Sequence, residues 1–165
     1  MECTEHSDAM HERGTWKACD NMAKYNITFE QLEEQHGDRK YIEWTDDLNL
    51  LDSRVRGQFE GTVPTDSPPN VIGTYIPGFK NLPAAELVEE GLMRENEDIR
   101  SWLELHGFKS DRPTVIMCNV GIQATLLGYA IESIFPHNPV QVYNGSLREM
   151  DIRNPKRVSG VIENV

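Results

Sequence analysis

An uncharged apolar run, TVIMC at 114–118, leads directly into the glycine-containing segment NVG and then into an apolar helical segment. β-Branched side chains dominate the run, and a strand without a polar face is normally covered by other elements on both sides. The segment 121–135 has apolar residues nearly all round a helix, which indicates a helix buried against a sheet. The two segments together favour an α/β fold with a mainly parallel sheet.

Strands and helices also alternate along the rest of the chain. Thr28, with Gln31 three residues later, has the form of a capping box and opens a short helix. Gly107 is typical of the residue that ends a helix. The other predicted elements are strands at 41–44, 48–52 and 140–143, helices at 82–90 and 96–106, and a long irregular connection over 57–81.

Both ends of the chain lack sustained hydrophobic periodicity. We therefore expect a flexible N-terminal tail over 1–25, one domain over 26–152 and a C-terminal tail over 153–165. A chain of 165 residues is long enough for one domain with a real hydrophobic core.

The charge balance excludes several classes of partner. The formal net charge is −11, whereas nucleic acids and anionic membranes are bound by Lys/Arg patches. No apolar run approaches the roughly 20 residues of a transmembrane helix, and the first residues do not have the form of a secretory signal. We expect a cytoplasmic protein with no nucleic-acid partner and no membrane partner.

The three cysteines, Cys3, Cys19 and Cys118, do not have the regular spacing of a disulfide framework or a zinc site. The five histidines are scattered as well, so we expect no metal and no cofactor. Cys3 and Cys19 are interpreted as solvent-exposed thiols, with a resolving role for one of them as the alternative. Cys118 is the candidate for reactivity.

Cys118 follows the central predicted strand and precedes the buried helix. Ligand sites in open α/β sheets lie beyond the carboxyl ends of the strands. The N-terminus of the helix and the amides of the Gly121 loop both stabilise a negative charge, such as a thiolate or a persulfide. A buried, unreactive cysteine at a strand end explains this local pattern equally well.

Five motifs in sequence order extend the argument beyond this loop. They are LLDSR at 50–54, QFEG at 58–61, YIPGFKNLP at 75–83, CNVGIQA at 118–124 and YNGSLREM at 143–150. In order and spacing, the chain resembles a rhodanese domain, most closely the C-terminal domain of the thiosulfate and 3-mercaptopyruvate sulfurtransferases. The resemblance covers about three quarters of the chain.

The resemblance implies a three-layer α/β/α fold with a mainly parallel five-stranded sheet. It also implies that Cys118 carries sulfur as a persulfide, from a small donor of the thiosulfate or 3-mercaptopyruvate class to cyanide or a thiol. Besides Cys118, it assigns the active-site loop and substrate binding to Asn119, Val120, Gly121, Ile122, Gln123, Gln58 and Arg54.

Several of these positions depart from the family pattern. Gln58 stands where active relatives carry an anion-binding arginine, and Ser67 lies near the place of a second one. Asn119 and Val120 replace the Arg-Lys or Gly-Ser of the relatives, and Gln123 replaces a frequent threonine. Each lost charged hydrogen bond weakens donor binding by about 1–3 kcal/mol. We therefore expect weak or altered use of the usual anionic donors.

Two arginines could compensate for the lost charges. For Arg54 we favour a structural ion pair with Asp52, two residues earlier, and keep a role in donor binding as the alternative. Arg56 would have to reach the pocket from a neighbouring position. The spacing alone does not decide between these roles.

The main alternative function is a catalytically weak or inactive rhodanese-like module that binds or regulates. A Cys-based phosphatase is disfavoured, because its loop needs an arginine six positions after the cysteine and Ala124 stands there. The relatives usually carry a sister domain that closes one side of the pocket, and none fits before residue 26. We therefore expect an open pocket unless the chain forms an oligomer.

Overall fold

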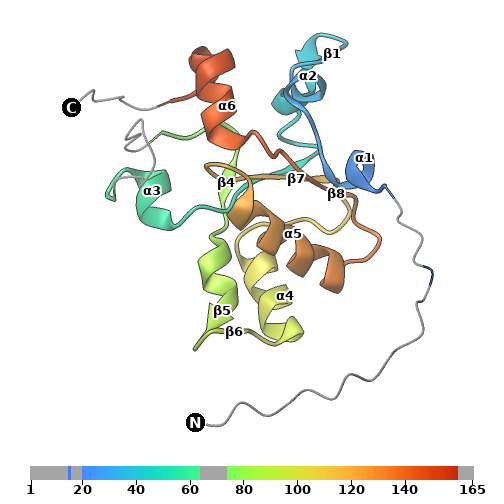
Figure 1. Cartoon of the computed structure of the whole chain (residues 1–165), viewed down its shortest axis with the longest axis vertical. Coiled ribbons are helices and arrows are strands. Elements are labelled where there is room, and N and C mark those ends of the chain that lie inside the picture. Colours follow the sequence, from blue (N-terminus) through green and yellow to red (C-terminus); the bar gives the residue numbers. More distant parts are fainter. Residues whose placement is uncertain (1–14, 16–19, 64–73, 160–165) are drawn as a thin grey trace.

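A four-stranded parallel sheet forms the centre of the computed structural model, which describes residue 15 and residues 20–63 and 74–159 (Figure 1). The strand order is β4-β3-β7-β8, and each neighbouring pair is parallel. The bounds are β3 Asn49–Asp52, β4 Lys80–Asn81, β7 Thr114–Met117 and β8 Val140–Val142. All residues of β3 and β7 are buried, as predicted for strands covered on both faces.

The fifth strand of the expected sheet is reduced to a single parallel bridge between Asn26 and Val142. The Ile27 amide donates to the Val142 carbonyl over 3.1 Å, so the chain does run beside β8 at this point. It cannot continue as a strand, because α1 (Met22–Tyr25) ends just before the bridge and Thr28 caps the next helix. The three-layer α/β/α fold is confirmed, with four strands and this bridge.

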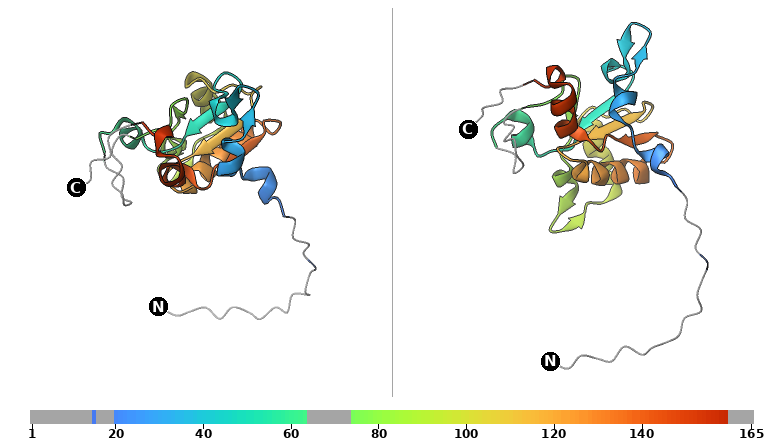
Figure 2. Two further views of the ribbon diagram at one scale, coloured as in Figure 1. Left: turned by 90° about the horizontal axis from the view of Figure 1, so that it is seen from above. Right: turned by 45° about the horizontal axis from the view of Figure 1, so that its top comes forward.

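Helices cover the two faces of the sheet, as the tilted view in Figure 2 shows. They are α4 (Asn96–Leu105) and α5 (Ile122–Ile134) on one face, and α2 (Phe29–Leu32) and α6 (Ser146–Arg153) on the other. Alternate residues of the strands supply the two cores: Leu51 and Ile116 pack on the first face, Leu50 and Val115 on the second. No helix in the described part of the chain is long and apolar enough to cross a membrane.

Local sequence signals predicted some of the short elements correctly and others wrongly. The Thr28 capping box is present, with both reciprocal hydrogen bonds to Gln31. The strand predicted over 41–44 is wrong: Lys40 N–H donates to the Glu43 carboxylate over 2.8 Å, which starts a 3-10 helix. The remaining short elements are β1 Gln35–His36, β2 Arg39–Lys40, η1 Tyr41–Glu43, α3 Arg56–Glu60, η2 Ala84–Leu87, β5 Val88–Glu89, β6 Leu92–Met93 and η3 Pro155–Arg157. The helix expected over 82–90 is thus a 3-10 turn followed by a hairpin.

Both ends of the described chain are attached to the domain. Before residue 26, Tyr25 donates its hydroxyl hydrogen to Glu132 of α5 over 2.8 Å. After residue 152, α6 ends at Arg153, η3 follows, and Ser159 forms an antiparallel bridge with Tyr75. Residues 154–159 therefore do not form the loose tail that we expected. The other residues of the expected tails, at 1–14, 16–19 and 160–165, lie outside the described residues, as does Ser67.

Arg157 fastens the C-terminal segment, and we expect Arg157→Ala to lower the free energy of unfolding by about 1–2 kcal/mol at pH 7. Its guanidinium donates to Glu33 over 2.6 Å and to Glu43 over 2.8 Å, and 20 % of the Arg157 side chain is exposed. Burial raises the pKa of Glu33, but the charged hydrogen bonds from Arg157 and Lys40 outweigh burial and hold that pKa below its ordinary value. Urea titration at several pH values measures the change.

The lowered pKa of Glu33 determines whether its contribution to the free energy of unfolding rises or falls with pH. A carboxyl group with a lowered pKa stabilises the fold above its unfolded pKa, here about 4.5, and this stabilisation is lost as the pH falls through the folded pKa. The stability difference between wild type and Arg157→Ala should therefore narrow below about pH 4.5. A difference that stays constant from pH 7 to pH 3 would contradict this account.

Candidate active site

Cys118 is the first residue after β7, at the carboxyl end of the parallel sheet. The Ser53 amide, just beyond β3, donates to the Met117 carbonyl over 2.9 Å, so pairing of the two strands continues up to the cysteine. Cys118 is a free thiol and is only 2 % exposed. The predicted position, past the end of a central strand where ligand sites of open sheets lie, is confirmed.

The loop after Cys118 points a backbone donor at the sulfur. The Gly121 amide donates to Cys118 Sγ over 3.0 Å. Gly121 has φ +90, a conformation that L side chains rarely adopt, and it packs directly against Asn144. Helix α5 begins at the next residue, so its N-terminal dipole adds to the same field. This geometry stabilises negative charge on the sulfur.

Helix α6, which covers the opposite face of the sheet from α5, is hydrogen-bonded to the cysteine loop. The Cys118 amide donates to Ser146 Oγ over 3.2 Å, and Ser146 Oγ donates to the Tyr143 carbonyl over 2.8 Å. Ser146 is fully buried and has φ +54, which is uncommon for a residue other than glycine. Leu147 N–H then donates to the Cys118 carbonyl over 3.1 Å. The predicted site residues did not include Ser146, although the motif at 143–150 contained the signal.

Gln58 and Asn119 are brought together beside the cysteine loop. Gln58 lies on α3, and its side-chain oxygen accepts a hydrogen bond of 3.4 Å from the Asn119 amide group. Both side chains are half-buried. Two neutral amides thus meet here. The resemblance implies an anion-binding arginine at position 58 in active relatives, and an arginine at position 119 in the thiosulfate enzymes.

Arg54 is not part of this group. Its guanidinium binds Asp52, with Nε 2.9 Å from each carboxylate oxygen, and both side chains are 0 % exposed. The Arg54 Nη2 also donates to the Thr74 carbonyl over 2.7 Å. The favoured interpretation, a structural ion pair, is therefore correct. The described contacts of Arg54 give no support to the alternative role in donor binding.

Arg56, the other candidate arginine, and the nearby Lys80 also have partners elsewhere. Arg56 makes two hydrogen bonds to the Glu86 carboxylate, at 2.6 and 2.7 Å. Lys80 Nζ donates to the Gly107 carbonyl over 3.1 Å. Neither residue shows a described contact with the Cys118 loop.

The remaining predicted loop residues differ in exposure, and the two apolar ones are exposed. Val120 is 38 % exposed, Ile122 is 75 % exposed, and Gln123 is half-buried. Among the described residues, no group of three or more His, Cys, Asp or Glu side chains could hold a metal ion. Cys3 and Cys19 lie outside the described residues.

Known proteins are similar to this chain in sequence and in fold. A scan against models of known protein families found no match. The Caenorhabditis elegans protein named "Putative thiosulfate sulfurtransferase mpst-1" is 50% identical over 151 residues, which are 88% of this chain and 46% of that protein. Human 3-mercaptopyruvate sulfurtransferase is 29% identical over 128 residues, 76% of this chain and 40% of the enzyme. The crystal structure of the Saccharomyces cerevisiae Tum1 protein matches with a TM-score of 0.68 and 24% identity, over 86% of this chain and 48% of that one.

The chain has a cysteine loop at the end of a parallel sheet, and it is 50% identical to a relative over 88% of its own residues. It therefore belongs to the rhodanese-like sulfurtransferase family. It spans less than half the length of the two curated relatives named above.

Proposed function

We propose that the chain transfers sulfane sulfur from a donor of the thiosulfate or 3-mercaptopyruvate class to a thiophile, such as cyanide or a thiol, through a persulfide on Cys118. The observation that carries the proposal is the 3.0 Å hydrogen bond from the Gly121 amide to Cys118 Sγ. A fixed backbone donor stabilises charge on the thiolate and on the persulfide without reorganisation during the reaction. The family and the names of its sulfurtransferase members support the same reaction class.

The atoms and electrons of both transfer steps balance with Cys118, the donor and the thiophile. The Cys118 thiolate attacks the sulfane sulfur of thiosulfate, the S–S bond of the donor breaks, and sulfite leaves with the bonding electrons. With 3-mercaptopyruvate, the C–S bond breaks instead, and the enolate of pyruvate leaves and takes up a proton. The thiophile then attacks the outer sulfur, and Cys118 departs as the thiolate. No metal or cofactor is required for either step.

The test is to measure sulfur on Cys118 by mass spectrometry after incubation with each donor. We expect a gain of one sulfur atom on the peptide that contains Cys118, and its loss with formation of thiocyanate when cyanide is added. Cys118→Ser should abolish both. The matched control is the double variant Cys3→Ser and Cys19→Ser, which should behave as wild type. Equal thiocyanate formation by wild type and Cys118→Ser would exclude the proposal.

A weak or inactive rhodanese-like module is the second candidate. The contact between Gln58 and Asn119 favours it, because neutral amides cannot replace a guanidinium in binding a sulfonate or a carboxylate. The pairing of Arg54 with Asp52 favours it too. If no donor of either class adds sulfur to Cys118, this candidate is preferred over the enzyme.

A further inference from the structure

The first turn of α6 is bound to the backbone of the cysteine loop at two consecutive residues. Leu147 N–H donates to the Cys118 carbonyl over 3.1 Å, and Arg148 N–H donates to the Asn119 carbonyl over 3.3 Å. Leu147 is buried, whereas Arg148 is exposed. The side chain of Arg148 therefore starts directly beside the loop and has solvent around it.

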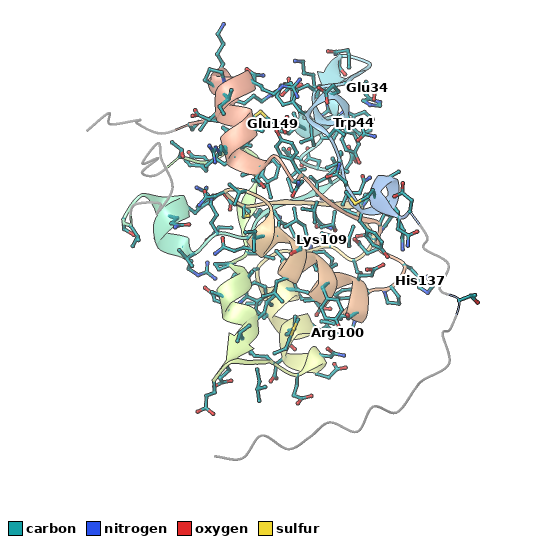
Figure 3. All side chains as sticks on the ribbon, in the orientation of Figure 1. Glu34, Trp44, Arg100, Lys109, His137 and Glu149 are labelled. Atoms are coloured by element: carbon teal, nitrogen blue, oxygen red, sulfur yellow. The ribbon has the colours of Figure 1, made fainter. Side chains whose placement is uncertain are left out.

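The charge of Arg148 is not neutralised within the described part of the chain. Its guanidinium makes no hydrogen bond and no ion pair there. The next residue on α6 is Glu149, labelled in Figure 3, and its carboxylate binds Arg153 over 2.9 Å. Arg153 also binds Glu30 over 2.6 Å. Glu30 and Glu149 are therefore both paired with Arg153 and not with Arg148. Arg148 is thus held at the cysteine loop by its backbone amide, while its guanidinium has no partner among the described residues and is available to a ligand.

We propose that Arg148 binds the anionic group of the sulfur donor. This inference rests on the proposed function and deepens it, since it places a small donor with a carboxylate or a sulfonate-like oxyanion group at the loop. The Gly121 amide would face the reacting sulfur, and the guanidinium would hold the charged end by bidentate hydrogen bonds. A chain of net charge −11 has no general attraction for such a donor, so the attraction has to be local.

A charge-selective alkylation of Cys118 tests this proposal without requiring sulfur transfer. Iodoacetate and iodoacetamide both form a C–S bond to Sγ and release iodide, but only iodoacetate carries a negative charge. The measured quantity is the ratio of the two alkylation rates, iodoacetate to iodoacetamide, on the peptide that contains Cys118. We expect Arg148→Gln to lower this ratio about fivefold, the upper end for an exposed ion pair, and Arg148→Lys to lower it less.

Arg112→Gln is the matched control. It removes the same charge, and the Arg112 side chain likewise has no hydrogen bond or ion pair within the described residues. Arg112 precedes β7 and so lies at the end of the strand opposite to Cys118. We expect wild-type selectivity from this variant. Equal effects of Arg112→Gln and Arg148→Gln would show a general effect of net charge and overturn the proposal, as would an unchanged ratio in Arg148→Gln.

The donor kinetics separate this inference from the proposed function. If wild type forms the Cys118 persulfide, Arg148→Gln should raise the KM for thiosulfate about fivefold with little change in kcat, and added salt should narrow the difference. If wild type forms no persulfide but the alkylation ratio still depends on Arg148, the anion site stands and the sulfurtransferase proposal fails. If persulfide forms and neither the ratio nor KM depends on Arg148, the anion site fails alone.

Discussion

Replacing Arg54 by methionine is expected to lower the free energy of unfolding by about 3–5 kcal/mol, the range for a buried ion pair that loses one partner. Arg54 and Asp52 are both completely buried, and the carboxylate also accepts a hydrogen bond of 3.0 Å from the Arg54 amide. Without the guanidinium, a carboxylate with no counter-charge remains in the interior. Equilibrium unfolding in urea measures the loss, and an unchanged m value would show that the unfolded state is the same.

Two further variants separate this effect from a loss of packing. Arg56→Met, two residues on, removes a half-buried pair with Glu86 and should cost only about 1 kcal/mol, because water still reaches both side chains. The double variant Asp52→Leu and Arg54→Met leaves no buried charge and should be more stable than Arg54→Met alone. If Arg54→Met costs no more than Arg56→Met, the guanidinium of Arg54 does not stabilise the fold by neutralising Asp52.

Residue type and spacing were sufficient to predict the central part of the molecule. The β-branched, uncharged run before Cys118 can be accommodated only where both faces are covered, and β7 lies there. The apolar helix that follows needs a sheet to bury it, and α5 packs on one. The pair formed by Asp52 and Arg54 was predictable as well, because the two residues are only two positions apart.

The features that were missed depend on contacts between distant parts of the chain. The Ser146 hydroxyl accepts a hydrogen bond from the amide of Cys118, 28 residues away in sequence. The backbone amide of Arg148 donates to the carbonyl of Asn119. Arg157 packs against Glu33 from the other end of the sequence, which turns an apparently unpatterned tail into part of the domain. Local periodicity carries no information about such partners, and only the folded backbone shows which carbonyls and carboxylates lie within reach.

The cysteine loop keeps its backbone donor although the side chains at positions 58 and 119 are neutral. Its backbone supplies the donor to the sulfur through Gly121, and this donor does not depend on which side chains surround it. The contact between Gln58 and Asn119 changes what the loop can recognise, since the side chains around a site select its ligand. Chemistry at the sulfur and recognition of the donor can therefore vary separately in this fold.

Gly121→Ala is expected to slow the formation of the Cys118 persulfide about 100-fold, as misplaced or lost backbone donors do in active sites. At φ +90 an alanine is strained, and its Cβ would collide with Asn144 Oδ1 and lie 3.0 Å from the Asn144 carbonyl oxygen. The loop must move to relieve this contact, and the Gly121 amide then no longer points at Sγ. Single-turnover mass spectrometry of the Cys118 peptide measures the rate.

Gly37→Ala provides the control for backbone strain alone. Gly37 has φ +67, an added Cβ there would meet nothing within 4 Å, and the residue lies in the turn between β1 and β2. This variant should cost about 1 kcal/mol of stability and leave the persulfide rate unchanged. Asn144→Ala should restore part of the rate in Gly121→Ala, because it removes the colliding side chain but leaves the backbone contact. A Gly121→Ala variant with the wild-type rate would show that the Gly121 amide does not act on the sulfur.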